Sequence, residues 1–214
     1  MALESYTTLA RRAEFRYEEK KSVFIGEAAP CEREEDAIAF ISSVKSRFPD
    51  ARHHVYAYLL RENGKNRYSD DHEPQGTAGM PVLDVIRKNE CTDTVVVVTR
   101  YFGGVLLGTG GLVRAYTAAA VGALKAAGVV TYRIYRHLSL GFSYADYNKV
   151  SKEIEKSGVR ILDTAFGEGV ILTVSIPKEE SDAFSASMTE MTGGRAVIEV
   201  LSECFEHGGE NSVK

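Results

Sequence analysis

The sequence contains no tryptophan, only three cysteines in 214 residues, and no long apolar run. Its strongly apolar stretches are far shorter than the roughly 20 residues of a membrane-spanning helix. Cys31, Cys91 and Cys204 are widely separated, without the paired spacing of zinc sites or redox dithiols. We therefore expect reduced cysteines without a role, no cofactor and no membrane association.

A strong charge bias is also missing, since the formal net charge is −4. The charges are nevertheless uneven: residues 1–137 hold 19 Lys and Arg against 17 Asp and Glu, whereas residues 138–214 hold 7 against 13. An anionic partner is therefore expected on the first part of the chain. The acidic start, Met1–Ser5, has no basic and apolar signal region, which predicts a cytoplasmic protein.

The chain is organised around residues 99–116, which carry five of the nineteen glycines. The valine run 95–98 before this segment lacks polar alternation, which is typical of a strand covered on both faces. Small residues at helical spacing follow over 112–127. The pattern predicts a strand, a glycine-rich loop and a helix. The glycines that allow close approach there are Gly103, Gly104, Gly108, Gly110 and Gly111.

Two interpretations of this central loop stay open. In the first, Thr109 caps the helix, its free N–H groups favour an anion, and Arg100 and Arg114 are charged donors. In the second, the glycines only allow a tight connection between strand and helix. Neither standard phosphate fingerprint is present, because no Gly-Lys-Ser/Thr follows the glycines and no acidic residue is placed for a ribose.

A second loop, residues 70–79, combines acids with a similar arrangement of glycines around Thr77. Two helix N-termini could then face one anion. Asp70, Asp71 and Glu73 are a candidate Mg²⁺ site, since Mg²⁺ prefers oxygen ligands. The alternative is that these acids form internal salt bridges with Arg100 or Arg114, which would cancel the positive field.

Two histidines, His53 and His54, lie on a strand predicted over residues 52–60. Adjacent strand residues point to opposite faces, so at most one of them can join a site. Each fits a packed strand histidine better than a ligand. Tyr101 and Phe102 are either an exposed aromatic pair or part of the core and its rim.

The pattern of elements indicates an α+β protein of two domains, residues 1–136 and 137–203, followed by a polar, poorly ordered tail over 204–214. In the first domain we expect strands within 12–29, a helix that starts near Glu32 and ends before Pro49, a hairpin at Asn63-Gly64 and a helix ending near Asn89. The second domain has the order βαββαβ, which is that of a ferredoxin-like unit.

The sequence carries three ordered motifs, which are His53 to Ala57, Asp70 to Gly79, and Arg100 to Gly104 with Leu107 to Tyr116. Together they resemble the YigZ/IMPACT family, and the resemblance covers roughly residues 15–135. His72 and Gln75 differ from the glycine and the small residue usual in that pattern. The resemblance implies a first domain similar to domain 2 of ribosomal protein S5. It also implies a second, ferredoxin-like domain similar to the last domain of elongation factor G.

The family's surface, carried onto this chain, centres on nine residues. They are His54, Asp70, Asp71, Glu73, Thr77, Arg100, Tyr101, Arg114 and Tyr116. The resemblance implies a role in translation, because eukaryotic members look like regulators that compete for the coactivator of a kinase acting on an initiation factor. For bacterial members, association with RNA or the ribosome is an analogy from fold.

We therefore expect a binding protein that acts in or near translation, with RNA, the ribosome or a protein as partner. No nucleophile with a base emerges, so an enzyme is the less favoured interpretation. Its form would be a small-molecule enzyme that uses the glycine loops for a phosphate group and the three acids for a metal. A third hypothesis is a pure protein-interaction module, which requires an exposed apolar patch.

Overall fold

The computed structural model describes residues 5–214, apart from the side chain of Glu210, and it divides into two compact units. The first unit holds Tyr6–Thr131 and Gly208–Lys214, and the second holds Ser5 and Tyr132–His207. The division falls within β7 (Val129–Phe142), so the domain boundary predicted at residue 136 lies further along that strand. The expectation drawn from Met1–Ser5 rests mainly on residues outside the described part.

The first unit is built on a five-stranded antiparallel sheet. Its strands, in spatial order, are β2 (Ala13–Glu19), β3 (Ser22–Pro30), β6 (Thr94–Tyr101), β4 (His53–Leu59) and β5 (Asn66–Ser69). A further short strand, β1 (Ser5–Leu9), pairs with β7. The predicted hairpin after β4 contains a short 3₁₀ turn, η1 (Glu62–Gly64).

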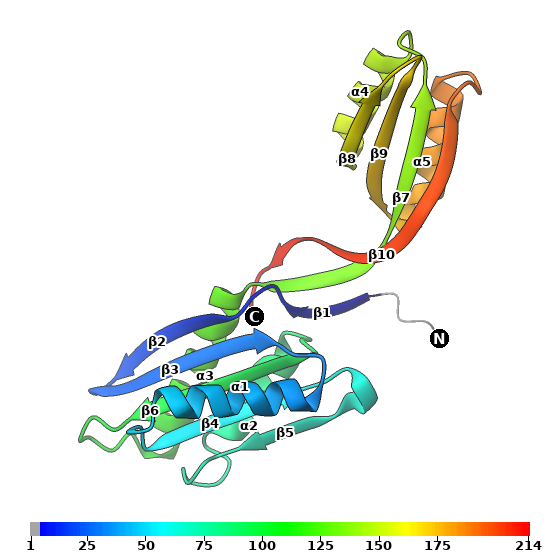
Figure 1. Cartoon of the computed structure of the whole chain (residues 1–214). Coiled ribbons are helices and arrows are strands. Elements are labelled where there is room, and N and C mark those ends of the chain that lie inside the picture. The colour runs from blue at the N-terminus through cyan, green and yellow to red at the C-terminus, as the bar shows by residue number, and fades with distance from the viewer. Residues whose placement is uncertain (1–4) are drawn as a thin grey trace. The chain divides into compact units, whose positions relative to one another are not determined.

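Helices cover both faces of this sheet. Figure 1 shows α1 (Glu34–Arg47) in front of the sheet, with α2 (Gly79–Lys88) and α3 (Gly108–Ala127) behind it. Val95 and Val97 belong to the core beneath α1, whereas Val96 and Val98 belong to the core beneath α2 and α3. The prediction that the valine run forms a strand covered on both faces is therefore confirmed.

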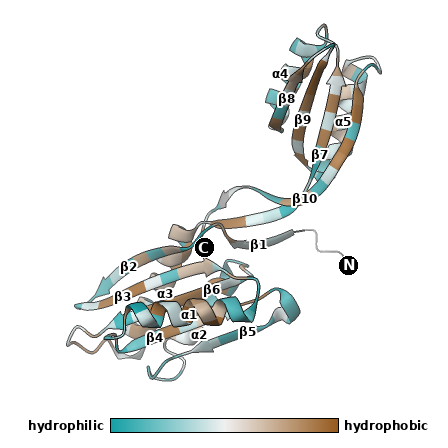
Figure 2. Ribbon diagram, viewed as in Figure 1, coloured by the Kyte–Doolittle hydropathy of each residue, from teal (hydrophilic) through white to brown (hydrophobic). Residues whose placement is uncertain are grey.

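The second unit has the order β7, α4 (Tyr147–Ser157), β8 (Arg160–Phe166), β9 (Val170–Pro177), α5 (Lys178–Met191) and β10 (Val197–Asn211). β9 pairs with both β7 and β8, and β10 pairs with β7. The spatial order β8, β9, β7, β10 confirms the predicted ferredoxin-like unit. Figure 2 shows the interior strand β9 largely in brown, the hydrophobic end of the scale.

The prediction of a poorly ordered tail over residues 204–214 is wrong. β10 continues to Asn211, and Val213 packs against the core of the first unit. The backbone N–H of Lys214 donates to Asn89 Oδ1 at 2.7 Å. Sequence patterning predicted this strand but missed its end, because the last part is polar and glycine-containing, without the apolar alternation that marks a half-buried strand. None of the helices formed by the described residues is both long and apolar enough to span a membrane.

Candidate binding site

A pocket of about 430 Å³ lies where β6 ends and α3 begins, at the central glycine-rich loop. Its apolar lining comes from Pro74, Phe102, Leu106, Leu107 and Leu112. Its polar lining comes from Arg52, His53, Glu73, Arg100 and Thr109, together with Gly108. The pocket thus joins the two loops that the sequence predicts to act together.

The polar floor of the pocket is an ion pair between Glu73 and Arg100. Arg100 Nη1 donates to Glu73 Oε1 at 2.5 Å, and the hydroxyl of Tyr116 donates to the same oxygen at 2.8 Å. Burial raises the pKa of Tyr116, and the charge of Glu73 raises it further, so this phenol stays a neutral donor. Of the two alternatives for the acids, internal pairing therefore describes Glu73.

The guanidinium of Arg100 lies near two aromatic rings as well as beside Glu73. Its carbon is 5.4 Å from the ring centroid of Phe24 and 5.7 Å from that of Phe102. Arg100 Nε is buried, and it has no hydrogen-bond partner among the residues that the structure describes. A buried donor without a partner carries a free-energy cost, which a ligand atom can offset.

His53, rather than His54, lines the pocket, which corrects the choice of His54 as the site residue. In the antiparallel pairing of β4 with β6, His53 is opposite Arg100, so the two side chains share a face. His53 Nδ1 lies 2.8 Å from the carbonyl oxygen of Asp71, and its Nε2 lies 3.9 Å from Glu73 Oε1. His54 faces the other side, where its Nε2 lies 3.0 Å from the carbonyl oxygen of Phe48.

Asp70 and Asp71 hold the backbone of the second loop. Asp70 accepts hydrogen bonds from the backbone N–H groups of Gly76, Ala78 and Gly79, at 2.9, 3.1 and 2.8 Å. Asp71 accepts one from the N–H of His54 at 2.6 Å. Across the described residues, Asp70, Asp71 and Glu73 do not form a group of converging metal ligands.

Neither Thr109, the predicted helix cap, nor Thr77 caps a helix. The hydroxyl of Thr77 donates to the carbonyl oxygen of Pro74 at 2.6 Å, and Asp70 takes the N–H groups at the start of α2. Thr109 lies inside α3, which begins at Gly108, one residue before the predicted cap. Gly108 has a φ of 71°, a conformation that side chains other than glycine rarely adopt.

The remaining predicted residues lie around the pocket without lining it. Tyr101 points away from Arg100 and donates to Asp50 Oδ1 at 2.8 Å. Arg114 is exposed on α3, so it does not join Arg100 as a second donor in the pocket. Gly103 packs on the backbone of Lys21, and a Cβ there would lie 2.0 Å from its carbonyl carbon. Gly104, Gly110 and Gly111 are also outside the lining residues.

Sequence reasoning chose His54 over His53, and it missed Arg52 and the apolar lining apart from Phe102. The signal for His53 was present in the alternation of residues 53–59, but the choice of face depends on the pairing of β4 with β6. The loop residues Leu106 and Leu107 carried no periodic signal. His72, where the family pattern has glycine, adopts a φ of 69°. This is the left-handed conformation, which histidine adopts more often than most residues other than glycine.

Both parts of the chain match known protein families. Residues 20–124 match the Impact N-terminal domain, and residues 140–195 match a domain of unknown function, DUF1949. The IMPACT family member YvyE of Bacillus subtilis (strain 168) is 36% identical over 213 residues, which cover 99% of this chain and 98% of that protein. The chain belongs to the IMPACT family.

Two further similarities agree with this membership of the IMPACT family. The IMPACT family member YigZ of Escherichia coli (strain K12) is 32% identical over 187 residues, covering 86% of this chain and 92% of that protein. A solved structure described as the crystal structure of a hypothetical protein superimposes with a TM-score of 0.58 at 31% identity. It covers 94% of this chain and 99% of that one. The pocket lies wholly within the residues that match the Impact N-terminal domain.

Proposed function

We propose that this chain is a translation-associated binding protein that contacts a protein surface, free or on the ribosome, through the rim of the pocket. The observation that carries the proposal is the loop after β6. Leu106 is 83% exposed there, and Phe102 and Val105 beside it are exposed too. Exposed apolar side chains grouped around a pocket are typical of interaction sites.

The charges of the pocket support a protein partner over RNA. Arg100 is buried and already paired with Glu73, so it adds little positive field at the surface. RNA binding by phosphate contacts needs several free cations and weakens steeply with salt. Contacts made mainly by Leu106 and Phe102 should resist salt, because apolar burial does not depend on charge screening. The translation context is supported by the family resemblance alone.

A second candidate is a small anionic ligand, which the unpartnered Nε of Arg100 favours. The first turn of α3, at Gly108 and Thr109, adds backbone N–H groups to the same pocket. The volume of about 430 Å³ also lies within the range of small-molecule sites. We assign these residues a binding role and no catalytic step.

Binding of the purified chain to ribosomal subunits at low and high salt tests the first candidate. Leu106→Ser should weaken binding about tenfold, as expected for an apolar contact at the centre of an interface. Ile38→Ser is the matched control, since Ile38 is 48% exposed on α1, on the other face of the sheet. We expect wild-type binding by the control at both salt concentrations.

Other outcomes would reassign the site. Binding that falls steeply with salt and is unchanged in Leu106→Ser would indicate RNA as the partner. If the wild type binds neither ribosomal subunit, the partner protein surface does not lie on the ribosome. The small-ligand candidate would then be examined through the thermal stability of wild type and Arg52→Ala with added pyrophosphate. An increase confined to the wild type would support it.

A further inference from the structure

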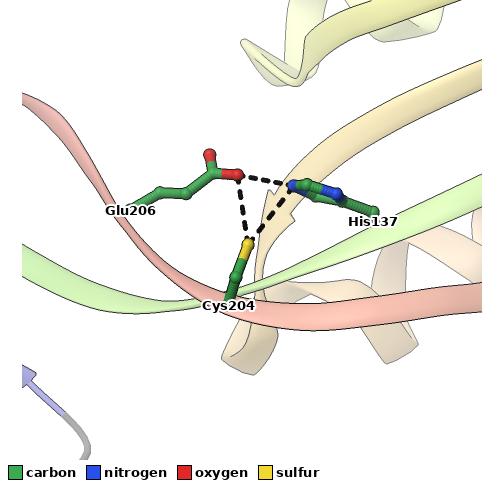
Figure 3. Close-up of side chains that lie close together, drawn as sticks. All are labelled: His137, Cys204 and Glu206. Carbon is green, nitrogen blue, oxygen red and sulfur yellow. Dashed lines mark hydrogen bonds and ion pairs between the residues drawn. The ribbon is translucent and has the colours of Figure 1, made fainter.

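The second unit contains a cluster of three different metal-ligand side chains, His137, Cys204 and Glu206 (Figure 3). His137 Nε2 lies 2.5 Å from Glu206 Oε1 and 3.5 Å from Cys204 Sγ. Cys204 Sγ lies 3.4 Å from the same Glu206 oxygen. Within the described part of the chain, this is the group of side chains whose ligand atoms lie close enough to share one metal ion.

Strand geometry produces this cluster from residues far apart in sequence. Cys204 and Glu206 are two residues apart on β10, so both side chains leave the strand on one face. β10 pairs with β7, which carries His137. Spacing along the chain therefore predicts no role for Cys204, whereas the paired strands place an imidazole and a carboxylate beside its sulfur.

Neighbouring side chains bind one side-chain atom each of Glu206 and His137, and the other two atoms, Glu206 Oε1 and His137 Nε2, face each other. Glu206 Oε2 accepts from Ser175 Oγ at 2.9 Å and also from Arg160. His137 Nδ1 lies 3.3 Å from Ser202 Oγ. Metal-binding histidines and carboxylates are usually oriented by such outer hydrogen bonds. The inner atoms, Nε2 and Oε1, are the ones nearest the sulfur.

The spacing of these atoms is close to that of a tetrahedral zinc site. Zinc bonds of about 2.3 Å to sulfur and about 2.1 Å to nitrogen or oxygen place sulfur about 3.6 Å from each other ligand. The observed sulfur distances are 3.5 and 3.4 Å. Only the pair of Nε2 and Oε1 must separate, from the 2.5 Å of a hydrogen bond to roughly 3.4 Å.

We propose that His137, Cys204 and Glu206 form a binding site for Zn²⁺. A thiolate, an imidazole and a carboxylate suit zinc, whereas Mg²⁺ and Ca²⁺ prefer oxygen ligands alone. The thiolate and carboxylate together balance the divalent charge. All three side chains are only partly buried, which leaves a path for entry and a fourth position for water or a group from a partner.

Metal titration of the purified full chain tests this site. After removal of metal with a chelator, we expect one Zn²⁺ per chain in competition with a chromophoric chelator. Co²⁺ should give a near-ultraviolet charge-transfer band from the thiolate. Cys204→Ser should remove that band, and Cys204→Ser and Glu206→Gln should each weaken Zn²⁺ binding by more than the 10- to 100-fold typical of losing an outer partner. Ser202→Ala should weaken Zn²⁺ binding about tenfold.

Matched controls separate the site from the rest of the chain. Glu199→Gln changes an exposed glutamate on the same strand, β10, and His72→Gln changes an exposed histidine of the first unit. Both controls should bind Zn²⁺ as the wild type does, and circular dichroism should show that every variant is folded. Failure of the wild type to bind one Zn²⁺, or equal binding by Cys204→Ser and Glu199→Gln, would overturn the proposal and leave a hydrogen-bonded cluster.

Discussion

Two carboxylates that pair with arginine, Glu73 in the first unit and Glu206 in the second, differ in burial. The side chain of Glu73 is 4% exposed and is held by Arg100 and Tyr116. The side chain of Glu206 is 17% exposed, and its cationic partner Arg160 is 56% exposed. Both carboxylates are paired with arginine, but only the first pair is removed from water.

This difference separates a structural pair from an exchangeable one. A buried charge that loses its partner keeps its full desolvation cost, so Glu73 and Arg100 must stay together. A partly exposed carboxylate can trade a hydrogen bond for water or a metal at much lower cost. A ligand in the pocket therefore has to bind groups that are not part of the ion pair of Glu73 with Arg100, such as Arg100 Nε. A ligand at Glu206 can instead replace one of the hydrogen bonds of that carboxylate.

Arg100→Ala is expected to have the largest effect. It leaves Glu73 buried with the Tyr116 hydroxyl as its remaining donor, and breaking a buried ion pair costs about 3–5 kcal/mol of unfolding free energy. Urea denaturation of the purified chain measures this loss. Arg87→Ala is the control, since Arg87 and Asp84 form an exposed pair, and it should cost less than about 1 kcal/mol. A similar loss in both variants would contradict the structural role of the Arg100 pair.

Tyr116→Phe should have the next largest effect. The substitution keeps the ring, which packs against Phe24 with centroids 5.1 Å apart, and removes only the hydroxyl that donates to Glu73. Hydrogen bonds to charged groups contribute about 1.5–3 kcal/mol, so a loss in that range is expected. The same denaturation experiment reports it. An unchanged unfolding midpoint would mean that Arg100 alone satisfies Glu73.

Alkaline pH should weaken the first unit through its buried tyrosines. Burial raises the pKa of Tyr116, and burial with the hydrogen bond to Glu34 raises the pKa of Tyr58 to about 12. A pKa raised in the folded state gives a stability contribution that is complete below pH ~10 and is lost as pH rises above that value. For each tyrosine, the free energy of unfolding should fall by about 1.4 kcal/mol by pH 11.

The contribution of Tyr116 can be isolated by comparing wild type with Tyr116→Phe between pH 9 and 11. The variant should lose about 1.4 kcal/mol less than the wild type over this interval, because its unfolded state has one fewer phenol to ionise. Denaturation by urea at each pH measures the difference. Parallel losses in the two proteins would show that the Tyr116 phenol ionises in the folded state as readily as in the unfolded one.

Local patterns were enough for most of the fold. The valine run predicted a strand with two covered faces, and alternating and helical spacing predicted the ferredoxin-like order of the second unit. These features depend on neighbours along the chain, so the residues carry them directly. The end of β10, from residue 206 to residue 211, was not predicted because these residues are polar or glycine, and a strand without an apolar face leaves no periodic signal.

The site was predicted only in part, because its members are chosen by contacts between distant segments. Adjacent histidines had to face opposite sides, but the register of β4 against β6 decided for His53. Thr77 and Thr109 have the capping preference expected at helix starts, yet Asp70 took the N–H groups of α2. The cluster around Cys204 depends on the pairing of β10 with β7, which spacing does not encode.

Arg160→Ala should have the smallest effect on stability and therefore completes the comparison. Arg160 donates to Glu206 from a side chain that is mostly in solvent, and exposed ion pairs contribute at most about 1 kcal/mol. Ser175 remains as a donor to the same oxygen, so Glu206 is not left unpaired. Urea denaturation should place this variant within about 1 kcal/mol of the wild type. A loss near that of Arg100→Ala would mean that the fold depends on the Glu206 pair as strongly as on the Glu73 pair, and the contrast between the two carboxylates would fail.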